Sequence, residues 1–409
     1  MVLNMDIDKH HSPVGLPQFK ERLAIFTLAA IQFTHMVDFV IIMPLGPQFM
    51  RVFSIGSSEF GLLVSSYTFS AGLFGLFGAF FVDKFDRKSL LLFTYSGFTI
   101  GTFFCSIATN FHFLLSARVV AGAFAGILWS TILAIIGDII PDSRRGRATG
   151  TVMSAFSVAS IVGIPIGLFF ANSFGWSFAF SGLSVISFFV LILSWYSLPS
   201  VKGHIVKTDE ISPIRSILNV LQNSNHYKAF FLTTTLMFGG FSVIPYISPY
   251  MVSNVKIAET DLPYIYFFGG VFTFFTSQLI GRFSDRFGKV FIFKIVAAIS
   301  IIPIVLITNL PVISLFLAIS VTTVFMIFVS GRFVPALALI NSVADPKFRG
   351  SFMSVNSSVQ QLTAGLASSL AGFIIITGKH GLIKNYDKVG YVSIVATILS
   401  LFIAGRMKK

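Results

Sequence analysis

Acidic side chains inside apolar segments mark where this chain could carry out proton chemistry. Among its 16 Asp and Glu residues, Asp38 alone lies deep within a long apolar stretch, and Asp138 lies near the end of another. An ionised carboxylate in hydrocarbon costs at least about 2.5–3.5 kcal/mol and is seldom kept without a use. A carboxyl that gains and loses a proton there could carry the proton through apolar surroundings. Asp38 is therefore the candidate proton carrier.

His35 and Arg118 are the candidate partners of Asp38. His35 precedes Asp38 by three residues, so a helix places both on one face, and imidazole titrates near neutral pH when unperturbed. A buried guanidinium needs a counter-charge, which makes Arg118 the natural ion-pair partner. Two interpretations stay open. Either these residues exchange protons, or Asp38 and Arg118 form a fixed structural pair.

A second set of polar residues could contact a solute. Arg332 is the other deep cation, and no deep acid remains for it. It either holds an anionic substrate group or is capped by backbone carbonyls near Pro335. Five uncharged polar residues could line a cavity of mixed character: Asn356, Gln360, Gln361, Tyr246 and Tyr250. Hydrogen bonds between helices and placement in interfacial aromatic belts explain such residues equally well.

The composition shows which elements must position these residues. The chain is 55% hydrophobic and 11% charged, whereas an ordinary soluble domain is about a quarter charged. Uncharged runs at 89–117, 229–255 and 350–378 each exceed the roughly 20 residues that cross a bilayer as a helix. The runs are continuous rather than alternating, so helices and not barrel strands must satisfy the backbone. The predicted fold class is an all-α membrane protein.

Proline, glycine and polar residues divide the longer apolar runs into paired helices. Twelve transmembrane helices are predicted, at 22–48, 57–82, 89–110, 113–139, 147–172, 176–198, 228–253, 262–284, 290–309, 312–341, 350–378 and 389–406. These form an N-terminal tail, a six-helix bundle, a linker and a second six-helix bundle, at 1–21, 22–198, 199–227 and 228–409.

The basic residues predict the orientation, because Lys and Arg near helix ends resist translocation. Most of the 29 basic residues fall in alternate loops on the side of the N-terminus, so both termini are expected in the cytoplasm of a multi-pass inner (plasma) membrane protein. The net charge of +13 then has a topological cause, and no nucleic-acid partner is expected. The single cysteine, Cys105, lies within a span, so neither an internal disulfide nor a thiolate metal site is expected.

Two loop motifs recur at half the chain length. Acidic and basic residues follow the second and the eighth spans, with Asp83 and Asp285 202 positions apart. Arg-Gly pairs follow the fourth and the tenth spans, beginning at Arg145 and Arg349, which are 204 positions apart. Basic cytoplasmic loops occur in any membrane protein, but two motifs at nearly one offset indicate duplication of a six-helix unit.

The loop after the second span resembles the major facilitator superfamily motif Gly-x-x-x-Asp-Arg-x-Gly-Arg/Lys. The second copy matches at Gly281, Asp285, Arg286 and Gly288. The first copy keeps Asp83 but departs at Ala79, Lys84 and Asp86. The resemblance covers the whole chain and implies two six-helix bundles that alternate access to a site between them.

Two further segments resemble the twelve-helix drug and sugar efflux branch of that superfamily. Residues 118–122 resemble its Arg-x-x-Gln-Gly motif, with alanine in place of glutamine. Gly163, Pro165 and Gly167 resemble its antiporter signature, with a spacing nearer to the arabinose-type sugar efflux permeases. In this branch the first and fourth spans face the central cavity, which favours the pairing of Asp38 with Arg118.

The loop motif also predicts a conformational latch. Asp83 at the inner end of the second span can accept hydrogen bonds from the N-terminus of the eleventh, where the helix dipole is positive. The resemblance implies a charge network in the outward-facing state. The latch comprises Asp83, Arg87, Lys88 and Asp138, with Gly281, Asp285, Arg286 and Gly288 as its second copy. Ordinary surface charge is the alternative.

The expected function is proton-coupled export of a small drug-like molecule or sugar, with protons and the lipid bilayer as the other partners. A facilitator or importer with a purely structural Asp38 is the alternative. An enzyme is disfavoured because no His-Glu-x-x-His motif or Ser/His/Asp cluster lies in or beside the spans. A channel is disfavoured because duplicated halves suit a rocking transporter. No cofactor and no metal are expected, and the two halves in one chain predict a monomer.

Overall fold

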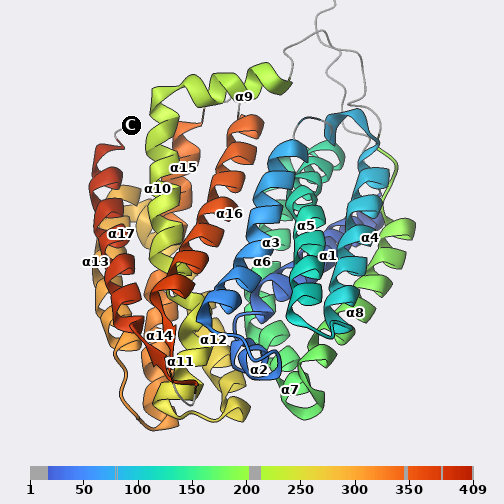
Figure 1. The fold of residues 1–409 in the computed structure, drawn as a ribbon. Coiled ribbons are helices and arrows are strands. Elements are labelled where there is room, and N and C mark those ends of the chain that lie inside the picture. Colours follow the sequence, from blue (N-terminus) through green and yellow to red (C-terminus); the bar gives the residue numbers. More distant parts are fainter. Residues whose placement is uncertain are drawn as a thin grey trace, which may run out of the picture.

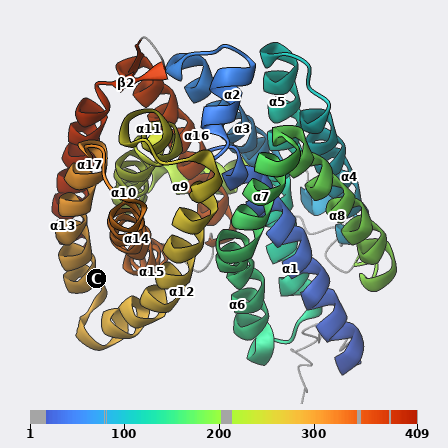
Figure 2. The ribbon, with the colours of Figure 1, turned by 90° about the horizontal axis from the view of Figure 1, so that it is seen from below.

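The structure is a computed structural model that describes residues 17–78, 80, 82–201, 213–344, 349–378 and 381–407. The described chain is nearly all helical, as predicted. Its two halves lie side by side, with blue to green helices in one half and yellow-green to red helices in the other (Figures 1 and 2).

The first half contains α1 (Gln18–Ile41), α2 (Gly46–Val52), α3 (Ser57–Gly78), η1 (Val82–Lys84), α4 (Arg87–Ser106), α5 (Phe111–Ile139), α6 (Asp142–Val158), the π-helical η2 (Ala159–Gly163), α7 (Ile164–Phe174) and α8 (Trp176–Ser197). One predicted boundary is wrong: the first span does not continue to residue 48. It ends at Ile41, because Pro44 and Pro47 lack the backbone donor that a helix interior needs, and α2 begins after a turn.

The second half contains α9 (Pro213–Gln222), α10 (Ser224–Phe241), η3 (Ile244–Tyr246), α11 (Ile247–Tyr250), the π-helical η4 (Met251–Val255), η5 (Glu259–Asp261), α12 (Leu262–Phe287), α13 (Lys289–Thr308), α14 (Leu315–Gly331), α15 (Phe333–Val343), α16 (Arg349–Ile374), β1 (Ile376–Thr377), β2 (Ile383–Lys384) and α17 (Tyr386–Arg406). Pro245 interrupts the seventh predicted span, where a 3-10 turn lies between α10 and α11.

Two details differ from the predicted elements. The linker contains the helix α9, which lies across one end of the second half and buries Ile217 and Val220 there (Figure 1). The eleventh span ends at Ile374, because the chain leaves the helix to form a hairpin in which β1 pairs with β2. We call the end of the molecule that carries α9 the linker end, and the other end the hairpin end.

Ten helical stretches in the described chain are long and apolar enough to cross a membrane. Three of them continue through a break in the regular helix, at 143–174, 226–255 and 315–343. The remaining two predicted spans, α12 and α16, each have 26 residues but are not among the ten. Polar groups lower the hydropathy of α16, which carries Asn356, Gln360 and Gln361.

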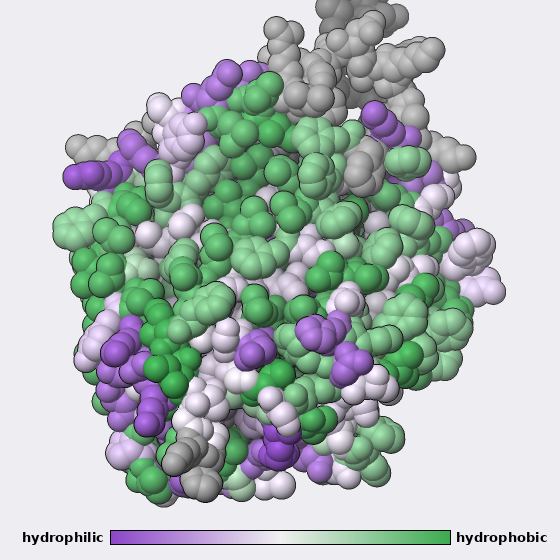
Figure 3. Space-filling model, in the orientation of Figure 1, coloured by the Kyte–Doolittle hydropathy of each residue, from purple (hydrophilic) through white to green (hydrophobic). Residues whose placement is uncertain are grey.

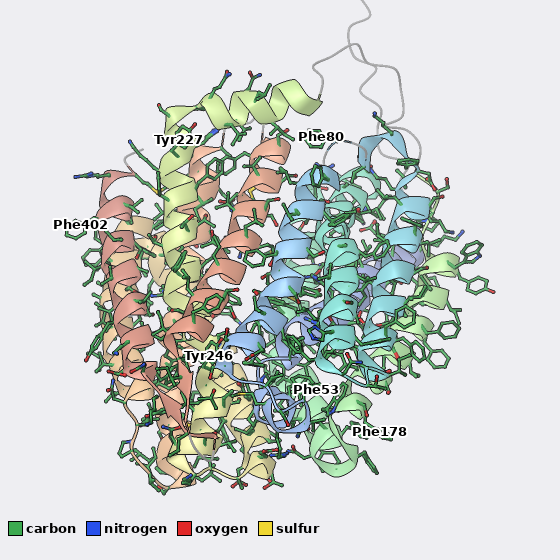
Figure 4. The ribbon with its side chains drawn as sticks, in the orientation of Figure 1. Phe53, Phe80, Phe178, Tyr227, Tyr246 and Phe402 are labelled. Carbon is green, nitrogen blue, oxygen red and sulfur yellow. The ribbon has the colours of Figure 1, made fainter. Side chains whose placement is uncertain are left out.

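The outer surface is apolar over the middle of the molecule. Figure 3 shows hydrophobic side chains dominating the central band of this face, with hydrophilic side chains gathered toward its ends. Phe178 and Phe402 project outward from α8 and α17, and each side chain is more than half exposed (Figure 4). A soluble protein rarely exposes so large an apolar surface, whereas lipid covers it in a membrane.

The halves meet along two pairs of helices. The helix α3 packs against α16, and α12 packs against α7 and η2. Near the hairpin end the contact is polar, since the Tyr246 hydroxyl donates to the backbone oxygens of Ser57 and Ser368 at 3.0 and 3.2 Å. Figure 4 shows Tyr246 lying between the two halves.

Candidate functional site

The predicted ion pair is present inside the first half. The Nη1 of Arg118 on α5 donates to Oδ2 of Asp38 on α1 at 2.8 Å, and both side chains are 0% exposed. The hydroxyl of Thr102 on α4 donates to Oδ1 at 3.1 Å. The guanidinium carbon of Arg118 lies 4.2 Å from the ring centre of Tyr67 on α3, where a cation is attracted to the aromatic face. Four helices therefore enclose one charged pair.

His35 lies on the same face of α1 as Asp38, as the spacing predicts. Its ring stacks on Tyr67 with 6.4 Å between centroids and meets Phe98 edge-on at 5.9 Å. The side chain is buried, and within the described chain no hydrogen bond joins His35 to Asp38. Tyr67 thus separates the imidazole from the ion pair while touching both.

Several buried polar atoms of this pair and its neighbours, and one farther along α1, have no hydrogen-bond partner in the described part of the chain. They are Oε1 of Gln32, Nδ1 of His35, the hydroxyl of Tyr67, and Nε and Nη2 of Arg118. A buried polar group without a partner costs about 1–3 kcal/mol, so such a cluster is typical of a functional site rather than of a stabilising core. We call Gln32, His35, Asp38, Tyr67 and Arg118 the proton cluster.

The sequence analysis missed Gln32, Tyr67 and Thr102 as members or neighbours of this site. A signal for Gln32 exists, because it precedes His35 by three residues, as His35 precedes Asp38. For Tyr67 and Thr102 no local signal exists, since only the packing of α3 and α4 against α5 brings them to the pair.

The glycines of the antiporter-like motif pack against α1 next to Asp38. A Cβ atom at Gly163 would collide with Cγ2 of Val37, and one at Gly167 would lie 2.9 Å from Cδ1 of Ile41. Pro165 lies in the first turn of α7, directly after the π-helical η2. The motif therefore lets the fifth span approach the helix that carries the proton cluster.

Arg332 is buried inside the second half, between α13, α17 and α10. Its Nη1 donates to the hydroxyls of Thr397 and Ser300 at 2.8 and 3.3 Å, and the side chain is 0% exposed. These hydroxyls are its acceptors within the described chain. Capping by backbone carbonyls, one of the two predicted alternatives, is not what the structure shows.

The other cavity candidates have different surroundings. The hydroxyls of Tyr246 and Tyr250 donate to backbone oxygens, that of Tyr250 to Leu310 at 3.0 Å. Asn356 accepts from Thr233 at 2.7 Å. Asn356, Thr233 and Gln360 line a small cavity. Its other lining residues are apolar: Leu236, Met237, Phe333, Leu337 and Ile340. Gln361 is half-buried and is not among those lining residues.

The first copy of the loop motif contains one predicted ion pair. Nε of Arg87 donates to Oδ2 of Asp138 at 3.1 Å at the linker end. Lys88 donates to the backbone oxygen of Trp195 at 2.6 Å. The side chain of Asp83 lies outside the described residues, so its contact with the eleventh span stays a prediction. In the second copy, Asp285 and Arg286 are exposed.

Asp86, which replaces the second glycine of the motif, has a structural role. Its carboxylate caps α4 by accepting from the Ser89 backbone N–H at 3.1 Å, and it accepts from Ser200 and the Val201 N–H at 3.0 and 2.7 Å. Burial alone raises the pKa of Asp86, but these hydrogen bonds outweigh it and lower the pKa below its ordinary value. Gly288, at the same place in the second copy, has φ +97°. The two copies therefore begin their next helix differently.

An unpredicted polar clasp joins the halves at the hairpin end. Arg51, in the last turn of α2, makes two hydrogen bonds to the carboxylate of Glu259 in η5, that from Nη2 at 3.1 Å. Asn172 of α7 donates to the backbone oxygen of Glu259 at 3.0 Å and accepts from Gln48 at 2.8 Å. Charged residues far apart in sequence gave no signal that they would meet. We call these four residues the hairpin-end clasp.

The sequence of this chain is similar to those of one known protein family. The profile of the Major Facilitator Superfamily matches residues 28–368 and 229–406. The uncharacterized MFS-type transporter YceJ of Bacillus subtilis (strain 168) is 22% identical over 371 residues, covering 90% of this chain and 93% of that protein. A probable sugar efflux transporter of Helicobacter acinonychis (strain Sheeba) is 26% identical over 272 residues, covering 66% of this chain and 68% of that protein.

Solved structures of low sequence identity share the fold. A D-xylose–proton symporter superposes with a TM-score of 0.75 at 15% identity, covering 94% of this chain and 97% of that one. An inward-facing bacterial homolog of the human lysosomal transporter Spinster has a TM-score of 0.73 at 17% identity, covering 96% and 97%. The match of the family profile along the chain, and not these folds alone, shows that this protein belongs to the major facilitator superfamily of membrane transporters.

Proposed function

We propose that this transporter exports a small organic solute, drug-like or sugar, in exchange for protons. The observation that carries the proposal is the buried Asp38–Arg118 pair surrounded by unpartnered polar atoms. The similarity to a probable sugar efflux transporter supports the choice of cargo. In this proposal α12 and α16 complete twelve spans, both termini face the cytoplasm, and the monomer resides in the inner membrane.

Protonation of Asp38 is the switching step of the proposed cycle. A neutral carboxyl no longer attracts the Arg118 guanidinium by charge, so the contact between α1 and α5 weakens. Both groups are 0% exposed in this conformation, and proton exchange therefore belongs to a different one. The clasp that joins the halves at the hairpin end supports assigning the present conformation to the inward-facing side of the cycle.

The remaining site residues take the following proposed roles. Asn356, Gln360 and Gln361 on α16 contact the cargo, with Thr233 as an additional hydroxyl beside Asn356. Arg87 and Asp138 form the part of the latch that lies within the first half, an ion pair already present in this conformation. Asp83 at the end of the second span supplies the contact between the halves that closes the linker end in the outward-facing state.

A flux assay in proteoliposomes tests the proposal. A radiolabelled pentose and a fluorescent cationic dye serve as probes, and a pH gradient supplies the driving force. We expect gradient-driven accumulation of one probe by the wild type, and we expect Asp38→Asn to lose it while keeping exchange without a gradient. Unchanged gradient-driven accumulation by Asp38→Asn would remove Asp38 from the coupling mechanism.

A facilitator without proton coupling is the second candidate, and complete burial of the ion pair favours it. The Asp38 carboxylate has both oxygens hydrogen-bonded, as in a fixed structural pair. Removing one partner of such a pair costs about 3–5 kcal/mol, so Asp38→Asn would then strongly destabilise the protein. In the coupled exporter the neutral carboxyl is a state of the cycle, and the same variant stays close to wild-type stability.

A further inference from the structure

Arg332 carries a buried positive charge that nothing in the described chain neutralises. Its Nη1 is hydrogen-bonded to two hydroxyls, whereas Nε and Nη2 have no acceptor. Placing an ion in a low-dielectric interior costs several kcal/mol unless a counter-charge offsets it. The described acids of the second half lie near helix ends, at Glu259, Asp261, Asp285 and Asp387, whereas Thr397 beside Arg332 lies in the middle of α17.

The first half has an acidic residue at the position that corresponds to Gly239 near Arg332. Asp38 and Gly239 are 201 residues apart, which is close to the 202 positions between the two loop motifs, and each lies in the first long helix of its half. Arg118 and Arg332 each lie in the fourth predicted span of their half. Gly239 therefore occupies the place where the first half has a carboxylate.

Hydroxyl partners follow the same correspondence. In the first half Thr102, on the third predicted span, hydrogen-bonds the carboxylate. In the second half Ser300, also on the third predicted span of its half, accepts directly from Arg332. The polar frame of the charged pair is thus kept while its acidic member is missing.

Contact geometry confirms that Gly239 faces the guanidinium. A Cβ atom built at Gly239 would lie 2.7 Å from Nη2 of Arg332 and 3.1 Å from the hydroxyl of Thr397. The edge formed by Nε and Nη2 is therefore next to the missing side chain. Because 2.7 Å is shorter than a normal contact, a carboxylate at position 239 would meet that edge only after the Arg332 side chain shifts.

We propose that Arg332 binds a small monovalent anion, a halide or a carboxylate, in the role that Asp38 fills in the first half. The guanidinium donates two N–H groups to the anion, a geometry suited to carboxylates, and a halide can occupy the same edge. Because Arg332 is 0% exposed, the anion enters when the helices of the second half separate. This inference does not rest on proton-coupled export.

Thermal unfolding of the purified full chain in detergent tests the site without any transport assay. Chloride and acetate are the two probes, and gluconate at equal ionic strength is the reference. A ligand that binds only the folded protein raises the Tm with concentration and saturates at its site. We expect the wild type to gain stability from chloride or acetate. Arg332→Gln, which keeps hydrogen-bonding groups and removes the charge, is expected to lose that gain.

Gly239→Asp provides the decisive second variant, because it supplies an internal counter-charge. We expect its Tm to be independent of chloride and acetate, whatever the cost of moving the Arg332 side chain to make room for the new carboxylate. Arg406→Gln removes a positive charge from an exposed site at the end of α17 and should keep the full anion response. A gain with chloride alone identifies a halide site, and one with acetate identifies a carboxylate site. An unchanged anion response in Gly239→Asp, or no response in the wild type, overturns the proposal.

Discussion

At the scale of single residues, the two buried arginines of this transporter have opposite charge balance. Arg118 has Asp38 at 2.8 Å, whereas Arg332 has hydroxyl groups alone in the described chain. Both guanidinium groups leave Nε and Nη2 without acceptors. Buried charges of this kind add little to the stability of either half. Such packing suits halves that must rearrange.

Gly163 offers a test of the packing beside the proton cluster. An alanine there would push against Val37, one residue before Asp38 on α1. We expect Gly163→Ala to lower the free energy of unfolding by about 1–3 kcal/mol, the usual cost of overpacking. Gly182 on α8 has no atom within 4 Å of its would-be Cβ, so Gly182→Ala is the matched control and should be neutral or slightly stabilising. Equal unfolding midpoints for the two variants in denaturant would contradict this account.

Asp86 predicts a pH-dependent contribution to stability outside the membrane. Its folded pKa lies below the unfolded value of about 3.9, so its contribution is present above that pH and is lost as the pH falls through the folded pKa. At pH 7 we expect Asp86→Ala to cost about 1 kcal/mol through loss of the helix cap. Thermal unfolding should show this difference shrinking in acid. Asp86→Asn is the control, because it keeps a capping oxygen that does not titrate. If the stability difference between Asp86→Ala and the wild type stays constant at low pH, the carboxylate is not its cause.

Sequence alone predicted the residues whose chemistry is unusual for a membrane interior, and it missed those whose role comes from contact. Asp38 and Arg118 could be paired because an isolated deep acid and a deep base need each other. Tyr67 is an ordinary span residue until α3 packs against α5 and brings its ring beneath the guanidinium. The partner of Asp86 is the segment after α8, which no local pattern indicates.

At the scale of elements, interruptions of helices lie where the halves meet or where the proton cluster is packed. The π-helical η2 precedes Pro165 and contacts α1 and α12, and the 3-10 turn η3 places Tyr246 between the halves. Proline positions explain the break in the seventh span at Pro245 and the end of α1 at Ile41. The π-helical geometry had no sequence signal, because it follows from how the flanking helices pack.

The hairpin-end clasp predicts a shift in the balance between conformations. Arg51 is 63% exposed and Glu259 is 19% exposed, so loss of their charge attraction should cost about 0.2–1 kcal/mol. We expect Glu259→Gln to raise the population opened at the hairpin end by up to about five-fold. The measurement is the distance between spin labels at the exposed residues Val52 and Val312, one in each half.

Labelling needs a background without the single native cysteine, Cys105, which is buried and free. Asp261→Asn is the control, since it removes a negative charge from the same short helix. If both variants give the wild-type distance distribution, the clasp does not set the conformational balance.

At the scale of the whole molecule, duplication explains most of what the sequence could predict. The offset between loop motifs indicated two equivalent halves, and apolar runs indicated most helices. The α12 and α16 helices are less apolar in composition than the ten others, and α16 packs along α3 of the opposite half. Divergence between the halves, such as Gly239 in place of an acid, became visible only from the contacts of Arg332.

The central claim is that the Asp38 carboxyl changes its protonation as the halves move. Infrared difference spectroscopy of the purified transporter tests it directly, because a protonated carboxyl gives a C=O stretching band that a carboxylate lacks. We predict that acidification of the wild type produces such a band from a shielded carboxyl, and that Asp38→Asn lacks it. The same titrating band at full intensity in Asp38→Asn, or its absence from the wild type, would contradict the account.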